Sequence, residues 1–221
     1  PSSDVIGAFQ RSLKLLGVKV LLNTRVKGLM LEGENGEERI AGVELADGRT
    51  LPADKCVVCT GGISYPATGS TGDGYRFAGD NGHKVTELLP ALVPFCVREA
   101  AAAALQGMAL KNVEAAVFDG KRELYREFGE LLFTHFGVSG PVILSASSFV
   151  AKVLKKKALT LSIDLKPALD REGLDARILR DFQEFSNKQF KNSLGRLYPA
   201  KLTPVMVSLS GIVGEKKIHE I

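Results

Sequence analysis

The chain has 221 residues, of which 45% are hydrophobic and 24% charged, a composition typical of a folded globular protein. Its apolar stretches are interrupted by Lys, Arg, Gly or Asp well before the roughly 18 residues that a membrane span requires, which excludes an integral membrane protein. The net charge of +4 is spread thinly and Trp is absent, so the sequence predicts neither a nucleic acid nor a membrane surface as a partner.

The two ends of the chain indicate that it is a segment of a longer protein. The first residue is Pro1 rather than Met, and the last, Ile221, is apolar and follows no terminating signal. No signal-peptide pattern opens the chain. Three cysteines, an odd number, favour a reducing compartment without a disulfide framework, so we expect a cytoplasmic location.

Cys56-Val57-Val58-Cys59 has the spacing of a redox pair or of half a zinc site. Residues 55–60 are, however, a short apolar run between Asp54 and Gly61-Gly62, which predicts a buried strand. Residues i and i+3 of a strand point to opposite faces, and no second C-x-x-C follows. We therefore expect buried thiols and no metal site.

The first 89 residues alternate helical and extended patterns. An N-terminal helix that ends before Gly17 is predicted by the helical spacing of Val5, Ile6, Phe9, Leu13 and Leu16. Strands are expected at 18–23, 55–60 and 84–88, and a meander at 29–31, 40–45 and 50–51 with turns at Asn35-Gly36 and Asp47-Gly48. The turn-rich segment 64–74 precedes a short helix with Thr71 or Asp73 as its N-cap.

A domain boundary is placed at Pro90, and the pattern is then mostly β up to residue 166. Strands are expected at 113–118, through Tyr125, at 131–134 and at 159–165, with a hairpin turn at Asp119-Gly120. A helix is expected at 141–150, and 100–104 is open as helix or loop. After Pro167 the pattern is helical, with Leu174, Ile178, Phe182 and Phe185 on one face and a last helix that is capped by Thr203 and ends at Gly211.

Two glycine-rich segments are candidate ligand sites. Thr60-Gly61-Gly62 ends a predicted strand, where ligands of open α/β sheets bind, although a plain tight turn explains the pair about equally well. In Gly69-Ser70-Thr71-Gly72-Asp73-Gly74, the N–H groups at a helix start suit a polar ligand. Asp73 would repel a phosphate and the Lys of a P-loop is absent, so a cap with turn glycines is the alternative.

His135, between Thr134 and Phe136, is a candidate general acid or base, although a packed structural histidine is the favoured interpretation. Ser139 lies in no G-x-S-x-G elbow. His83 and His219 have no partner at ligand spacing, so no metal is expected. These residues alone predict a multi-domain α/β protein with a glycine-rich crevice.

Taken together, these motifs resemble those of the aminoacetone-oxidase-like, or bile-acid-reductase-like (BaiN-type), FAD-dependent oxidoreductases. The matches follow the family's order along nearly the whole chain. They comprise residues 56–66, 69–75, 89–94, 110–113, 131–141 and 216–221.

The resemblance implies an α/β fold with an inserted β-barrel and a small helical subdomain. Residues 1–89 would then be part of a Rossmann-like FAD-binding domain, 90–166 the barrel and 167–221 the helical part. Thr60, Gly61 and Gly62 match the Ala-Thr-Gly-Gly segment that lies against FAD, with Cys59 in place of Ala. Contacts to the cofactor are also expected from Ser70, Thr71 and Gly72.

The family's G-x-G-x-x-G turn and its closing flavin-contacting segment have no counterpart in these residues. We therefore expect FAD in the longer protein and weak or no binding to this segment. The implied activity is flavin-dependent oxidation or reduction of a small organic substrate, with a nicotinamide nucleotide as a candidate reductant and Tyr65, Thr71 and His135 as candidate catalytic residues. The alternative is a non-catalytic insert that recognises a ligand or a protein through its barrel.

Overall fold

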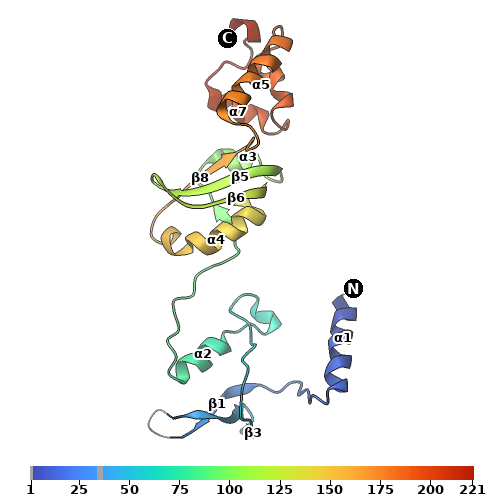
Figure 1. The fold of residues 1–221 in the computed structure, drawn as a ribbon, viewed down its shortest axis with the longest axis vertical. Helices are drawn as coiled ribbons and strands as arrows, with labels where there is room; N and C mark the ends of the chain where they lie inside the picture. The colour runs from blue at the N-terminus through green and yellow to red at the C-terminus, as the bar shows by residue number, and fades with distance from the viewer. Residues whose placement is uncertain (1, 34–36) are drawn as a thin grey trace. The chain divides into compact units, whose positions relative to one another are not determined.

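The computed structural model describes residues 2–33 and 37–221, whose contacts divide the chain into two compact units (Figure 1). The first unit is Pro1–Glu87 and the second is Leu88–Ile221. Among the described residues, no helix has the length and apolar character that crossing a bilayer requires.

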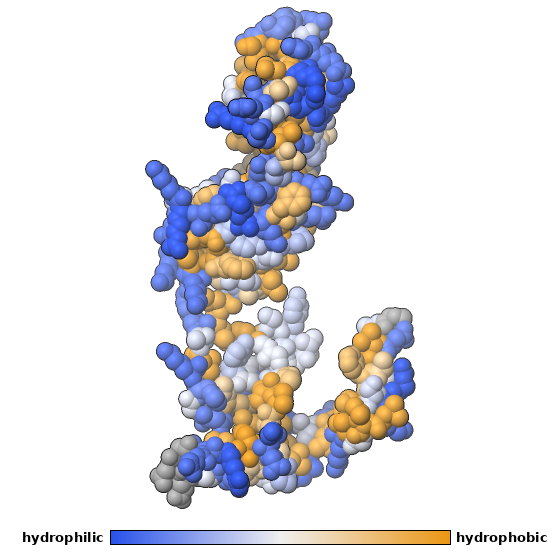
Figure 2. Space-filling view, viewed as in Figure 1, coloured by the Kyte–Doolittle hydropathy of each residue, from blue (hydrophilic) through white to orange (hydrophobic). Residues whose placement is uncertain are grey.

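Helix α1 (Ser2–Leu15) confirms the N-terminal helix predicted from the apolar spacing. Gly17 follows it with a φ of +69°, a conformation that glycine adopts without strain. None of the residues of α1 is buried, and Val5, Ile6 and Phe9 are 57–68% exposed. Figure 2 shows apolar residues on the surface of this helix. The apolar stripe that predicts α1 is therefore left exposed.

An antiparallel meander follows α1 in the first unit. Strands β1 (Val26–Glu32), β2 (Arg39–Leu45) and β3 (Thr50–Pro52) form a three-stranded sheet in that order, which confirms the predicted meander. In the turn between β2 and β3, the N–H of Gly48 donates to the carbonyl of Leu45 at 3.0 Å. The other predicted turn, Asn35-Gly36, lies outside the described residues.

Three strands predicted in the first unit do not form. Residues 18–23, 55–60 and 84–88 pair with no strand among the described residues. The thiols are not buried as expected, since Cys59 is exposed and Cys56 half-buried, and Val57 is 84% exposed. An apolar run predicts a buried strand only where neighbouring strands satisfy its N–H and C=O groups, and these segments have no such neighbour here.

The second unit is built on a five-stranded antiparallel sheet. Its order is β4 (Phe95–Cys96), β7 (Gly137–Ser139), β6 (Arg122–Phe133), β5 (Ala109–Asp119) and β8 (Thr160–Asp164), and it curls into a half-barrel. The predicted Asp-Gly hairpin is confirmed, with Asp119 opposite Arg122 and Gly120 at a φ of +59°. Residues 131–134 are expected as a separate strand, but 131–133 are instead the end of β6, which pairs with β5 along almost its whole length, and Thr134 follows the strand.

Helix α4 (Pro141–Leu154) packs on β6 and supplies much of the core. Gly140 precedes it at a φ of +98° and Pro141 begins it, as the sequence predicts. Residues 100–104, left open between helix and loop, form α3 (Ala100–Ala104). The core of the half-barrel is lined by buried side chains of both sheet and helices, among them Val113, Val117, Leu131, Val138, Val142, Ile143 and Val150.

The last 55 residues are helical, with a small core of their own. They form α5 (Arg171–Glu184), α6 (Phe190–Ser193) and α7 (Thr203–Ser210), with 3₁₀ turns at Leu194–Arg196 and Ile218–Glu220. Ile178 and Phe182 of the predicted apolar face pack on this core. Thr203 is the first residue of α7 rather than its cap, which is Leu202, and Gly211 ends the helix as expected.

Gly129 allows α4 to approach β6 closely. A Cβ at this position would lie 2.7 Å from Cγ1 of Val142, whereas a Cβ at Gly195 would meet nothing within 4 Å. We expect Gly129→Ala to lower the free energy of unfolding by about 1–3 kcal/mol, because the core would be overpacked. Urea unfolding followed by circular dichroism measures the change. Gly195→Ala is the control, and Gly129→Ala/Val142→Ala should recover part of the loss; a fully stable Gly129→Ala variant would contradict this packing.

Candidate functional site

The two glycine-rich segments predicted as separate candidate sites lie against each other in the first unit. The N–H of Gly72 donates to the carbonyl of Gly62 at 3.1 Å. Gly61 has a φ of +71°, and a Cβ there would lie 2.7 Å from Oγ of Ser70. The close approach of segments 60–62 and 69–72, which we call the glycine junction, therefore requires glycine at position 61.

The hydroxyl of Thr60 is buried at this junction. Its Oγ1 has no hydrogen-bond partner among the described residues, and a Cβ at Gly74 would lie 2.7 Å from it. A buried hydroxyl without a partner costs roughly 1–3 kcal/mol. Thr60 is therefore a polar group whose hydrogen bond a bound molecule or a further protein segment would complete.

Unpaired backbone donors accompany this hydroxyl. Within the described ranges, the N–H groups of Gly61, Gly62 and Ser70 donate to no acceptor. Successive N–H groups in a glycine-rich turn provide partial positive charge that suits an oxygen-rich ligand. The chemistry of this donor set fits a polar edge of a nucleotide cofactor.

Helix α2 (Asp73–Asp80) begins directly after the glycine junction. Its N-cap is Gly72, at a φ of +82°, and not Thr71 or Asp73 as predicted. Asp73 is instead the first helical residue, where a carboxylate is favoured by the helix dipole, and the Thr71 hydroxyl donates to it at 3.2 Å. The last helical residue is Asp80 and Asn81 is the C-cap, which agrees with the stop predicted from Asn81-Gly82.

Two arginines neutralise Asp73. Nη2 of Arg76 donates to Oδ1 of Asp73 at 3.2 Å, and Nη2 of Arg25 lies 3.9 Å from Oδ2. The hydrogen bond from Arg76 lowers the pKa of Asp73, against a smaller opposing effect of desolvation. Arg76 also donates to the carbonyl of Lys27 at 2.8 Å, which ties α2 to β1. The repulsion of a phosphate that the sequence predicts from Asp73 is thereby reduced.

The three candidate catalytic residues are divided between the two units, with Thr71 and Tyr65 in the first and His135 in the second. Thr71 lies in the glycine junction, and its hydroxyl is engaged by Asp73. Tyr65 precedes a 3₁₀ turn (Pro66–Thr68), with a φ of +57° and a side chain in solvent, the residue being 81% exposed. His135 belongs to the second unit, in the β6–β7 connection, where its exposed ring meets Phe136 edge-on at 4.8 Å between centroids.

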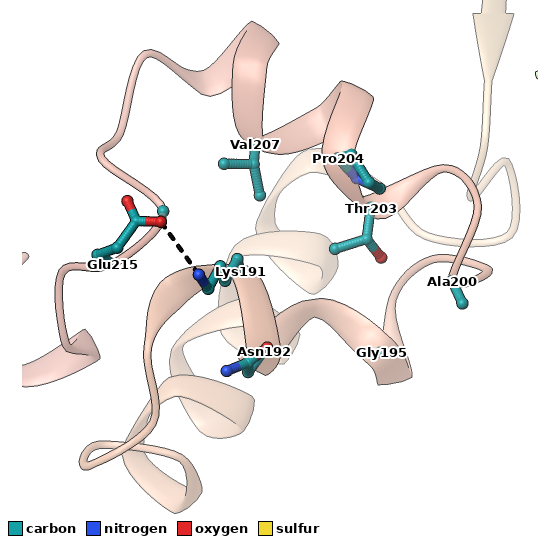
Figure 3. A pocket seen from close by; sticks show the side chains of 9 residues that line it. Lys191, Asn192, Gly195, Ala200, Thr203, Pro204, Val207 and Glu215 are labelled. Atoms are coloured by element: carbon teal, nitrogen blue, oxygen red, sulfur yellow. Dashed lines mark hydrogen bonds and ion pairs between the residues drawn. The ribbon is translucent and has the colours of Figure 1, made fainter. Parts of the chain in front are cut away.

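One pocket that the sequence does not indicate lies among the C-terminal helices. It has a volume of about 540 Å³ and is lined by residues of α6, α7 and the segment before the C-terminus (Figure 3). Its charged groups, Lys191 and Glu215, form an ion pair at 3.0 Å. In residues 2–33 and 37–221, no cluster of three or more His, Cys, Asp or Glu is placed to hold a metal ion.

The ion pair at Asp73 predicts a pH response. Because the pKa of Asp73 is lowered in the folded state, the pair stabilises the first unit above the ordinary Asp pKa, and that contribution is lost as pH falls through the lowered value. Carboxyl NMR titration should show Arg76→Gln raising the pKa of Asp73. Arg49→Gln, which removes the matching partner of Asp47, should raise only the pKa of Asp47. An unchanged Asp73 titration in Arg76→Gln would refute the assignment.

Comparison with known proteins identifies relatives along the whole chain. A 3-dehydro-bile acid delta(4,6)-reductase of Clostridium scindens is 27% identical over 212 residues, which cover 96% of this chain and 50% of that protein. Ribosomal RNA dihydrouridine synthases of Haemophilus influenzae and Escherichia coli are 30% and 31% identical over 93% and 75% of this chain, and over 48% and 39% of their own lengths. The chain thus spans half or less of the length of these relatives.

These relatives correct one expectation. The thinly spread net charge predicts no nucleic-acid partner, and two relatives whose names refer to ribosomal RNA contradict that prediction. Residues 1–146 match the HI0933-like protein Rossmann domain, and residues 89–221 match the HI0933-like protein barrel and H2TH domain. The family resemblance and the fold class are confirmed, and the chain belongs to the HI0933-like family.

Proposed function

We propose that the protein containing this chain is a flavin-dependent oxidoreductase that reduces a uridine of ribosomal RNA to dihydrouridine. The observation that carries the proposal is the 30–31% identity to two ribosomal RNA dihydrouridine synthases. The third relative is named as a reductase, so reduction rather than oxidation is the favoured direction.

The reaction saturates the C5–C6 double bond of uracil, which takes up a hydride and a proton. A reduced flavin, when bound, would supply the hydride, and a nicotinamide nucleotide is the proposed source of its electrons. The protein must hold the base beside the cofactor, exclude water and deliver the proton to carbon. Tyr65 and His135 carry groups capable of proton donation, whereas the Thr71 hydroxyl is already engaged by Asp73.

The glycine junction is the proposed contact with the cofactor. The N–H groups of Gly61, Gly62 and Ser70 and the hydroxyl of Thr60 are the donors that would face it, with Thr71 and Gly72 completing the turn. These residues include no cation to hold a pyrophosphate. We therefore propose that most of the residues that bind FAD lie in the rest of the parent protein, and that this chain alone binds FAD weakly or not at all.

A single-turnover assay tests the proposed activity. The full-length protein, reduced with NADPH under anaerobic conditions, should regain the absorbance of oxidised flavin faster with a uridine-containing ribosomal RNA fragment than in buffer. Mass spectrometry of that RNA should show a gain of two hydrogens per modified uridine. A full-length protein without flavin would contradict the proposal and favour the non-catalytic binding module. Reduction of a bile-acid enone with no change in RNA would refute the substrate.

Gly61→Ala tests the cofactor contact. The new Cβ would collide with Ser70, and the left-handed backbone would be strained, so we expect the full-length variant to lose bound flavin. Gly48→Ala is the matched control, because Gly48 also has a positive φ, +85°, but lies in the β2–β3 turn with nothing within 4 Å. The flavin-to-protein absorbance ratio measures occupancy. Equal ratios in the two variants would argue against a cofactor contact at Gly61.

A further inference from the structure

Basic side chains gather where the β5–β6 turn meets the C-terminal end of α4. Lys121 and Arg122 lie at the turn, and Lys156 and Lys157 follow the last turn of the helix. The ion pair between Lys157 and Asp119, at 2.7 Å, joins the two elements. Figure 2 shows hydrophilic side chains projecting on this side of the half-barrel. Positive charge is therefore concentrated at this place, although the net charge of the whole chain is only +4.

Much of this positive charge is uncompensated. In the part of the chain that the structure describes, Lys121, Arg122, Lys152 and Lys156 have no acidic partner. The acidic groups nearby are already engaged. Glu114 and Glu123 pair with Arg126, Glu127 accepts from the Tyr125 hydroxyl, and Asp119 pairs with Lys157. Lysines at a helix end also complement the helix dipole, but that does not account for the cations of the turn.

An aromatic ring lies exposed beside these cations. Phe149 is 71% exposed, and its ring centroid lies 5.0 Å from that of Tyr125 in a tilted arrangement. Phe149, Lys152 and Lys156 are spaced at i, i+3 and i+7, so they share one face of α4 and its C-terminal extension. A ring supported by a second aromatic on one side and open to solvent on the other is a platform on which a nucleobase can stack.

We propose that this basic–aromatic surface, formed by Lys121, Arg122, Phe149, Lys152, Lys156 and Lys157, binds RNA. The cations would contact phosphates, and Phe149 would stack on an unpaired base, the combination by which proteins hold single-stranded segments. The inference rests on the proposed function, which supplies RNA as the anionic partner. RNA is the favoured occupant because two relatives are named ribosomal RNA dihydrouridine synthases, and an anionic membrane, which cations and an exposed Phe would also suit, is an outcome of the test.

Salt-dependent binding tests the cationic half of the surface. The probe is a fluorescein-labelled RNA stem-loop with a uridine-rich loop, titrated with the full-length protein at several salt concentrations and followed by anisotropy. Replacing Lys121, Arg122, Lys152 and Lys156 with Gln should reduce the slope of log K against log[salt] by about 0.7 for each phosphate that the variant no longer neutralises. The control replaces four exposed cations of the helical part, Arg171, Arg180, Lys216 and Lys217, with Gln. The same charge is removed there, and the slope should stay unchanged.

Phe149 is tested separately. Phe149→Ala should weaken binding by about five- to a hundredfold with the salt slope unchanged, because base stacking does not release counterions. Phe149→Tyr should keep the affinity, since it keeps a stacking face. Phe128→Ala is the control, because Phe128 is 58% exposed and lies opposite Glu114 of β5, six residues along β6 from Arg122.

The outcomes separate this surface from the proposed activity. Wild-type affinity and slope in the quadruple variant would overturn the surface while leaving uridine reduction by the unaltered protein intact. Binding to phosphatidylserine vesicles but not to the stem-loop would also overturn it. If the unaltered protein binds RNA through these residues but reduces no uridine, the surface stands and the proposed function fails.

Discussion

Backbone hydrogen bonding between neighbouring strands determines which of the strand-like segments of this chain form a sheet. Strand β5 is paired on both sides, with β6 along almost its whole length and with β8 over five residues. The central strands of the half-barrel therefore satisfy their N–H and C=O groups within the sheet, which covers a core of buried side chains. Residues 18–23, 55–60 and 84–88 have strand-like sequences but no neighbouring strand among the described residues, and they form no regular structure and are largely exposed. The relatives are about twice as long as this chain. We therefore infer that the strands that pair with these three segments belong to the rest of the Rossmann domain.

This difference explains how much of the fold the sequence could predict. The helix at 2–15, the hairpin at Asp119-Gly120 and the helix after Gly140 depend on signals within a few residues, and all three are confirmed. Strands β4 and β7 are only two and three residues long and carry no alternation to detect. The prediction of buried thiols at Cys56 and Cys59 was wrong because burial depends on distant parts of the chain, not on the apolar run itself.

In the candidate site, too, the sequence indicated the segments but not the contacts between them. Glycine content indicated segments 60–62 and 69–74, but not that Gly61 touches Ser70 or that Gly72 binds the carbonyl of Gly62. The proposed RNA-binding surface could not be predicted from the sequence for a related reason. A net charge averages over the chain, whereas Lys121 and Lys156 are 35 residues apart in sequence and are brought to one side by the pairing of β5 with β8 and by the packing of α4 on β6.

A reductase for one uridine in a large RNA faces a problem of binding energy. Uracil is small and offers few groups to hold, so most affinity must come from parts of the RNA that do not react. Phosphate contacts supply such affinity without reading sequence, and a stacking ring adds a preference for an unpaired, accessible base. In this proposal, the second unit, which has a core of its own, supplies these contacts, and the glycine junction of the first unit is left to contact the cofactor. That separation explains why the polar and glycine-rich residues lie in the first unit and the basic–aromatic surface lies in the second.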